Sequence, residues 1–326
     1  MTGILQQFGM KAESTYGTDV TVDRFYELSD ESLQMGYGRT RSAGRRSGQR
    51  THRTDRFLPF KDVLGGSISL DVPTKGFGVL LNAITGGTAS VGSVTDSNYT
   101  QTHTIGTMLG KSYTLQVNRP DTGATSRVFT YGGCKVASAE FAIDVDGVLT
   151  CTVEWIGEDE TTATALASVS YASDFRVFSF VNATMTVAGT TTPCKNWRLK
   201  ITNPYETRRM VQGSALTLEP LENDLRTVEV SWTAEFTSLT DYNRAASATA
   251  AGALASVVMT CDGDVAHGGS TLPEIVFTTP KLDFTQASGP FQSANQIPMV
   301  DFTGTALYDG SSEPLTVTYR TTDSAI

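Results

Sequence analysis

The sequence predicts a mainly β fold of two tandem antiparallel β-sandwich or half-barrel domains, each with a short flanking α-helix and long loops. The chain has 326 residues, which is enough for two domains of ordinary size. Apolar residues make up 39% of the chain and charged residues only 18%. This composition is typical of short strands joined by small polar turns.

Apolar and polar residues alternate in several segments, as they do in a half-buried strand. The alternation runs through residues 67–72, 228–236 and 315–319. One face of residues 228–236 would carry Val228, Val230, Trp232 and Phe236. We therefore expect antiparallel strands that pack one face on a core and leave the other face polar.

A hairpin is predicted around Asp146-Gly147. Its core face would carry Phe141, Ile143, Leu149, Cys151, Val153 and Trp155. Side-chain parity then requires a three-residue loop, Val145-Asp146-Gly147, because a two-residue turn would place the two strands' apolar sets on opposite faces. This loop pairs Phe141 with Cys151, and Gly147 would supply the positive φ.

Two short helices are expected, each directly after a strand. The first would begin at Pro73, run through Phe77 to Ile84 and stop at Gly86-Gly87. The second would begin at Ser238-Leu239-Thr240-Asp241, which is a capping-box pattern, and end near Gly252.

Short internal repeats divide the chain into two halves. Residues 153–157 echo residues 300–304, and residues 37–41 echo residues 205–209. Each half reads as a strand, an arginine-bearing loop, a strand, a short helix and several further strands. We therefore predict one β domain over residues 1–165 and a second over residues 166–326.

A basic arm is predicted over residues 36–57 of the first domain. It contains Arg39, Arg41, Arg45, Arg46, Arg50, Arg53 and Arg56 against a single acid, Asp55. The whole chain has a net charge of −9, so the rest of it is strongly acidic. Because such an arm can dock on the body of another copy, we favour an inter-subunit arm. The alternatives are a nucleic-acid arm, which the acidic chain disfavours, and a plain solvated loop.

No motif for catalysis, a cofactor or a metal is found. His52, His103 and His267 are expected in polar or glycine-rich loops, without metal-ligand spacing. The four cysteines lie far apart, which favours free, buried thiols. We expect neither an enzyme nor a cofactor. The absence of a signal-peptide pattern and of long apolar stretches favours a soluble, unsecreted protein.

Five motifs of the first half occur in an order that is typical of one protein family. They are Glu13-Ser14-Thr15-Tyr16-Gly17-Thr18, Arg24-Phe25-Tyr26-Glu27-Leu28, Gly65-Gly66-Ser67-Ile68, Lys75-Gly76-Phe77-Gly78, and Gly110-Lys111-Ser112-Tyr113 with the hairpin after it. In this order they resemble the major tail tube proteins of siphophages, which are bacteriophages with long non-contractile tails. The resemblance covers mainly residues 10–160.

The resemblance implies a structural virion protein with two tail-tube-like domains. Copies of such proteins pair inner strands into closed rings, and the rings stack into a hollow tube. Genome DNA passes through the tube during ejection without specific binding. Two tube-like halves in one chain imply a trimer with pseudo-sixfold symmetry, with a hexamer as the alternative.

The resemblance also implies a location and further partners. The subunit would be assembled in the host cytoplasm and reside in the phage tail of the virion, with no membrane involved. Its other partners would be the tape measure protein and the tail terminator and distal tail proteins.

Lumen-facing acids can be predicted for such a tube. A wall of carboxylates repels phosphates over about a Debye length, roughly 8 Å at physiological salt. The candidates lie on the polar faces of predicted strands and are Asp71, Glu140, Asp144, Glu154, Glu229 and Glu235. The alternative is that these side chains solvate an outer sheet.

The competing interpretation is a surface or secreted β-sandwich that binds a carbohydrate or a receptor. It would predict exposed aromatic residues on one face and export signals, and the sequence shows neither clearly. A hydrolase on a β scaffold would need a catalytic constellation that this sequence lacks.

Overall fold

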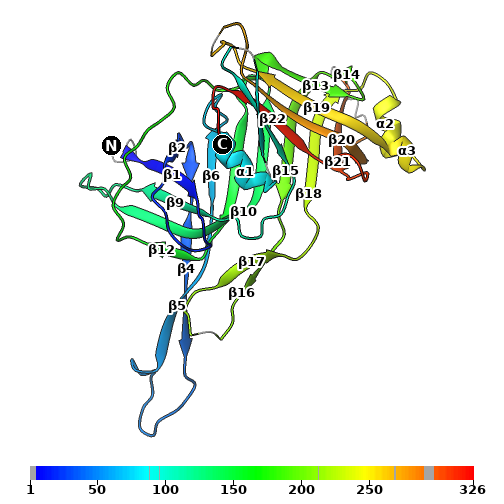
Figure 1. Cartoon of the computed structure of the whole chain (residues 1–326). Coiled ribbons are helices and arrows are strands. Elements are labelled where there is room, and N and C mark those ends of the chain that lie inside the picture. The colour runs from blue at the N-terminus through cyan, green and yellow to red at the C-terminus, as the bar shows by residue number, and fades with distance from the viewer. Residues whose placement is uncertain (1–4, 88, 95, 212, 268, 290–296) are drawn as a thin grey trace.

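The computed structural model describes residues 5–87, 89–94, 96–211, 213–267, 269–289 and 297–326. Strands dominate these residues, and helices are few and short. The paired strands run antiparallel, both in the large curved sheet and in two separate hairpins (Figure 1). The predicted mainly β, antiparallel fold is therefore confirmed.

The elements fall into two series along the chain. The first series is β1 (Gln7–Ala12), β2 (Arg24–Tyr26), β3 (Asp30–Glu31), β4 (Gln34–Arg41), β5 (Phe57–Gly65), β6 (Ser67–Asp71), α1 (Gly78–Thr85), β7 (Ser90–Ser93), β8 (Tyr99–Thr104), β9 (Tyr113–Asn118), β10 (Val128–Asp144), β11 (Thr150–Ile156) and β12 (Asp159–Thr161).

The second series is η2 (Phe180–Asn182), β13 (Ala183–Val187), β14 (Thr190–Thr191), β15 (Cys194–Thr202), β16 (Tyr205–Arg208), β17 (Leu218–Glu222), β18 (Thr227–Glu235), α2 (Thr240–Ala245), α3 (Ala250–Ala253), β19 (Leu254–Asp262), β20 (Glu274–Ala287), β21 (Met299–Ala306) and β22 (Thr316–Thr321).

A continuous ladder of strands forms the centre of the fold. Its order is β6, β11, β10, β15, β18 and β21. Register neighbours across it are buried, for example Ile68 with Val153 and Phe141 with Leu199. The predicted alternation is confirmed in β6, β18 and β22, whose apolar residues are buried while the residues between them are more exposed. One face of the ladder is thus core and the other is polar.

The predicted hairpin joins β10 and β11 in the expected register, with Phe141 opposite Cys151. All the predicted core residues of this hairpin are buried. The expectation for Gly147 was wrong, because the positive φ lies at Asp146, at 64°. Aspartate tolerates the left-handed region, so the turn does not need glycine at that position.

Helix α1 ends as predicted, at Gly86, whose φ of 70° and N–H bond to the Asn82 carbonyl close the last turn. It begins only at Gly78, because Pro73 instead forms an isolated bridge with Val177. The second predicted helix is split into α2 and α3. Ser238 Oγ does accept a bond from the Thr240 N–H, at 3.3 Å, near its start.

The same order of strand pairs occurs twice. In the first series β6 pairs with β11, β11 with β10, and β10 with β9. In the second series β18 pairs with β21, β21 with β20, and β20 with β19. The two series are joined by ladders between β10 and β15 and between β8 and β22. Strands from both sides of residue 165 thus belong to one sheet. The division into domains 1–165 and 166–326 stays a prediction.

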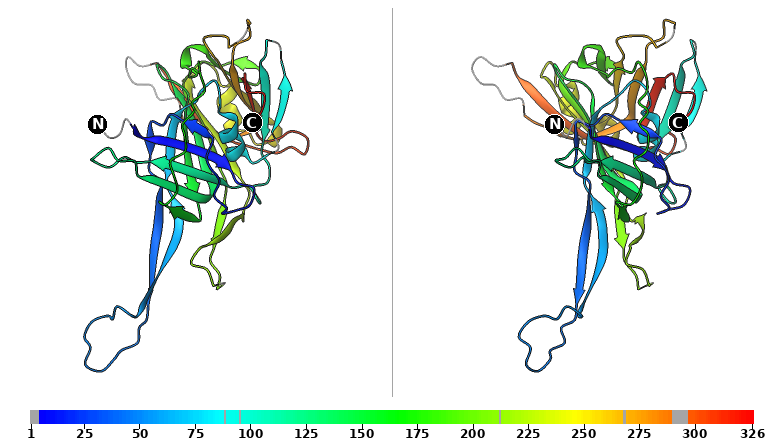
Figure 2. Two further views of the ribbon diagram at one scale, coloured as in Figure 1. Left: turned by 60° about the vertical axis from the view of Figure 1, so that its left-hand side comes forward. Right: turned by 90° about the vertical axis from the view of Figure 1, so that its left-hand side faces the viewer.

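Each series also carries a two-stranded hairpin directly before β6 or β18. The hairpin of β4 and β5 extends far from the body, and the shorter hairpin of β16 and β17 points in a similar direction (Figure 1). Two turned views show the longer hairpin standing clear of the rest of the chain (Figure 2). We call residues 34–65 the arm and residues 205–222 the second hairpin.

Candidate functional site

The predicted basic segment forms the outer end of the arm. Strands β4 and β5 pair from Gln34 and Gly65 at the root to Arg41 and Phe57, and residues 42–56 form the tip loop. Six of the seven arginines are exposed, the exception being the half-exposed Arg53. An isolated two-stranded ribbon buries little and is marginally stable alone. The outer part of the arm therefore exposes positively charged side chains to solvent or to another molecule.

Most of these arginines have no acidic partner. Arg53 donates two bonds of 2.8 Å to Asp55, which also lies 3.8 Å from Arg56. This contact with Arg53 holds the pKa of Asp55 at about 2. Among the described residues, no ion pair involves the other five arginines, which are Arg39, Arg41, Arg45, Arg46 and Arg50. Five guanidinium groups are thus available to another molecule.

The root of the arm is tied to the body. Tyr37 Oη donates to Glu160 Oε1 at 2.7 Å. Lys61 forms an ion pair with Asp159 and donates to the Glu160 carbonyl at 2.7 Å. Arg209 of the second hairpin lies over the Phe60 ring, 4.6 Å from its centroid. The root therefore has fixed contacts with β12 and the second hairpin.

A group of carboxylates lies beside the arm root. Glu13 is buried and accepts bonds from Ser112, Thr114 and the Gly133 N–H. Glu158 lies nearby, and burial together with the charges of Asp159, Glu13 and Asp19 raises its pKa to about 7. Burial and the neighbouring Glu13 likewise raise the pKa of Asp19. The arm root thus borders groups that are hard to ionise together.

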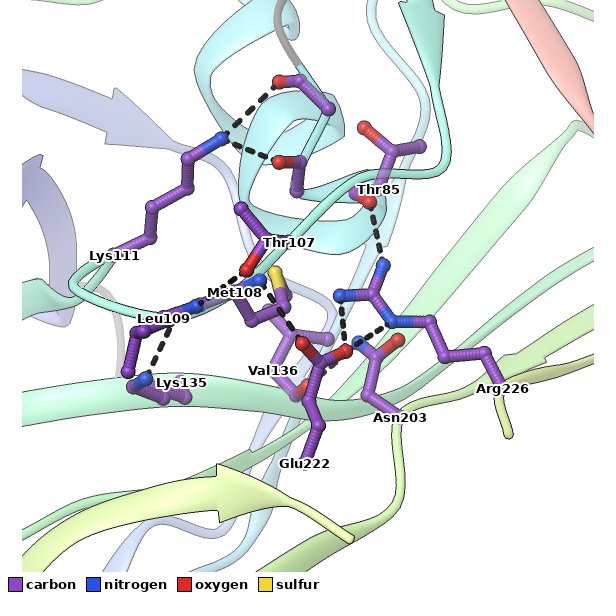
Figure 3. A network of polar contacts seen from close by, with 12 residues as sticks. Thr85, Thr107, Met108, Leu109, Lys111, Lys135, Val136, Asn203, Glu222 and Arg226 are labelled. Atoms are coloured by element: carbon purple, nitrogen blue, oxygen red, sulfur yellow. Dashed lines mark hydrogen bonds and ion pairs between the residues drawn. The ribbon is translucent and has the colours of Figure 1, made fainter. Parts of the chain in front are cut away.

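A polar network holds the second hairpin against the first series of strands (Figure 3). Lys135 on β10 is almost fully buried, and its Nζ donates to Glu219 Oε1 at 2.6 Å and to the Met108 carbonyl at 2.8 Å. Arg226 pairs with Glu222 and donates to the Thr85 carbonyl at 2.8 Å. These bonds connect the end of α1 and the strand β10 to the second hairpin.

The six candidate lumen acids lie on strands of the central ladder. Asp71 is on β6, Glu154 on β11, Glu140 and Asp144 on β10, and Glu229 and Glu235 on β18. Their neighbours along each strand are buried, so all six belong to the polar face. The structure thus brings them onto one face of one continuous sheet.

Sequence reasoning missed two cations on this face. Arg198 of β15 lies 3.3 Å from Glu140 and 3.5 Å from Asp144, and Lys200 is opposite both Glu140 and Glu229 in register. Parity could have found them, since both alternate with the buried Trp197, Leu199 and Ile201. The polar face is therefore mixed in charge with an excess of acids.

The histidines and cysteines are possible metal ligands by residue type. The prediction that His103 lies in a loop was wrong, because it is a buried residue of β8. Burial lowers the pKa of His103 to about 4, and His267 shares a 2.7 Å hydrogen bond with Thr74. Across the described ranges, no group of His, Cys, Asp and Glu side chains is arranged to hold a metal ion. The four cysteines are free thiols, and burial raises the pKa of each.

Comparison with known proteins adds one match. A family model described as a phage tail tube protein matches residues 3–306, which is nearly the whole chain. No curated protein matches the chain. In the part of the chain that the structure describes, no helix is long and apolar enough to cross a membrane.

Proposed function

The chain belongs to the phage tail tube protein family, and we propose that it self-assembles into stacked rings that form a hollow tube for genome DNA. A structural role in the phage tail follows from the family. The closure into rings, the stacking and the passage of DNA during ejection are our proposal. The observation that carries it is the continuous polar face of the central ladder, which gathers six carboxylates from four strands.

This face suits the wall of a DNA channel. Phosphates find an excess of carboxylates there, while Arg198 already has Glu140 and Asp144 as partners. Such a wall repels a passing polyanion instead of binding it. The opposite face of the same strands is packed core, so the polar face is the one free to line a channel.

Ring closure would use the repeated order of strand pairs. Each series supplies a set of strands built on the same pairing scheme, so one chain can occupy two equivalent positions around an axis. We propose a trimeric ring with pseudo-sixfold symmetry, with domains at residues 1–165 and 166–326. Closing a sheet into a barrel also pairs its edges, which would otherwise promote aggregation.

The arm would connect subunits through its arginines. It stands clear of its own body and carries five guanidinium groups that have no acidic partner among the described residues, while the chain as a whole is acidic. A second copy of the chain therefore offers the matching charge. In the assembled virion tail, the tube would also meet a tape measure protein, a tail terminator and distal tail proteins, after assembly in the host cytoplasm.

Electron microscopy of concentrated purified protein tests the proposal. Rings or hollow tubes of constant diameter are expected, and their top views should show three or six repeats. A protein that stays monomeric at every concentration and salt condition, with a stable fold by circular dichroism, would count against self-assembly. Arrays without a central channel would contradict the tube.

A further inference from the structure

Two clefts lie at matching places in the two series. The first cleft has a volume of about 360 Å³ and includes residues of β2, the end of β6 and residues 170–175. The second cleft has a volume of about 300 Å³ and includes residues 190–193, the end of β18 and the start of α2.

The strand pairing makes the two clefts equivalent. Strand β2 pairs with β1, which pairs with β9, just as β14 pairs with β13, which pairs with β19. Strands β6 and β18 also hold the same place beside β11 and β21. In both series a hairpin leads into one end of the strand, and the cleft lies at its other end. Each series thus has a hairpin at one end of its strand, β6 or β18, and a cleft at the other end of that strand.

We propose that the first cleft is the receptor for the arm tip of another copy of this chain, in the next ring. The inference rests on the proposed function and deepens it by naming the docking surface. The second cleft is its counterpart in the second series.

The chain's own arm cannot fill the first cleft. Residues 57–71 of β5 and β6 form a nearly continuous strand path with the tip loop before it and the cleft after it. At about 3.3 Å per residue this path spans about 50 Å. Figure 1 accordingly shows the arm tip and the upper end of β6 far apart. A tip that docks must therefore come from a second copy.

The first cleft has the chemistry that recognises guanidinium groups. It contains four carboxylates, from Asp23, Glu27, Asp71 and Asp323, against the cations Arg24 and Lys75. Glu27 and Asp71 are exposed and form no ion pair among the described residues. The rings of Phe25 and Tyr171 meet edge to face in the same cleft, 6.4 Å apart. Carboxylates beside aromatic rings suit arginine through charge-assisted bonds and stacking.

The geometry also gives the form of the assembly. The arm tip and the cleft lie at opposite ends of the path formed by β5 and β6. Their contact is therefore head to tail, and it leaves a free arm at one end of the assembly and a free cleft at the other. A head-to-tail contact that does not close on itself propagates into an open filament. Stacked rings of this kind grow along one axis.

A charge-exchange experiment tests the docking surface. The arm variant carries Arg45→Glu, Arg46→Glu and Arg50→Glu, the cleft variant carries Glu27→Lys, and a third protein combines the arm and cleft changes. Pelleting and electron microscopy measure tube mass, and Glu313→Lys, an exposed charge reversal outside the cleft, is the matched control. We expect each variant to lose about tenfold in tube mass, the combined protein to regain much of it, and the control to match the wild type.

Two results would overturn the proposal: a folded cleft variant that assembles like the wild type, or a combined protein that assembles no better than either variant. A second measurement, amide exchange of the wild-type protein, does not depend on whether a variant folds. In this experiment the amides of residues 23–27 and 170–175 should become protected on assembly. Exchange there that is equal in free and assembled protein also overturns it. If the wild type forms tubes but the cleft residues are not protected in them, only the proposed docking surface is wrong. If it forms no rings or tubes, the proposed function itself fails.

Discussion

Lys135 Nζ lies 2.6 Å from Glu219 Oε1, and only 1% of the Lys135 side chain is exposed. A buried ammonium of the first series is thus neutralised by a carboxylate of the second hairpin. The Met108 carbonyl is its other oxygen partner, at 2.8 Å. The position of the second hairpin, which supplies Glu219, therefore affects the stability of β10, which carries Lys135.

The first prediction concerns this pair. Glu219→Gln should lower the free energy of unfolding by about 3 kcal/mol, because it leaves a buried charge without a counter-charge. Lys135→Met should cost clearly less, since it removes the charge and keeps the volume. Urea unfolding of both variants measures the two values. A Glu219→Gln protein within about 0.5 kcal/mol of the wild type would show that the ammonium finds another partner.

The second prediction concerns the arm tip. Residues 38–56 should exchange their amide hydrogens rapidly in the free subunit and slowly after assembly. The reason is that the exposed tip loop buries nothing of its own, so only a partner can order it. Exchange followed by mass spectrometry on both states decides this. Equal protection in the two states would mean that the arm is already ordered alone.

The third prediction concerns the arm's charge. Arg45→Glu, Arg46→Glu and Arg50→Glu together should block stacking while circular dichroism and the melting temperature stay those of the wild type. Ser47→Ala with Thr51→Ala changes the same loop without changing its charge and should assemble normally. Wild-type stacking should also weaken as salt screens the contact. Tubes of normal length and salt tolerance from the reversed variant would identify the arm as a passive loop.

The fourth prediction concerns Glu158, whose pKa is raised to about 7 by burial and neighbouring carboxylates. The folded protein binds this proton more tightly than the unfolded chain, so its contribution favours folding at low pH and is lost as the pH rises from about 4.5 to about 7. Glu158→Gln should therefore stabilise the protein at pH 8, by on the order of 1 kcal/mol after allowance for solvent screening.

Thermal melts of Glu158→Gln and wild type at several pH values test this prediction. The difference between the two proteins isolates Glu158 from other groups, including the buried His103, whose lowered pKa acts in the opposite direction. The difference should grow between pH 4.5 and pH 7 and then stay constant. A difference that does not depend on pH would mean that Glu158 is ionised normally.

Local patterns predicted much of the sheet. Parity alone gave the pairing of Phe141 with Cys151, because burial of one face allows a single register. It could not show that Asp146 takes the positive φ, since both aspartate and glycine accept it in a turn. It also could not show that Pro73 would pair with Val177, because that contact joins segments about a hundred residues apart.

The positions of the charged residues in the fold were less predictable from the sequence. The arginines of the arm and the acids of the polar face are visible as charge and alternation in the sequence. The ladder between β10 and β15, which places Arg198 beside Glu140 and Asp144, depends on tertiary pairing that alternation does not encode. The same holds for Lys135, whose burial would not be expected without the partner at Glu219.

The orientation of the polar face in the assembled tube tests the account most directly, and a cryo-electron microscopy structure of that tube would measure it. The account predicts that β6, β11, β10, β15 and β18 line the channel with Asp71, Glu140, Asp144, Glu154, Glu229 and Glu235 turned toward the lumen. A structure with these carboxylates on the outer surface and a channel lined mainly by lysine and arginine would contradict it.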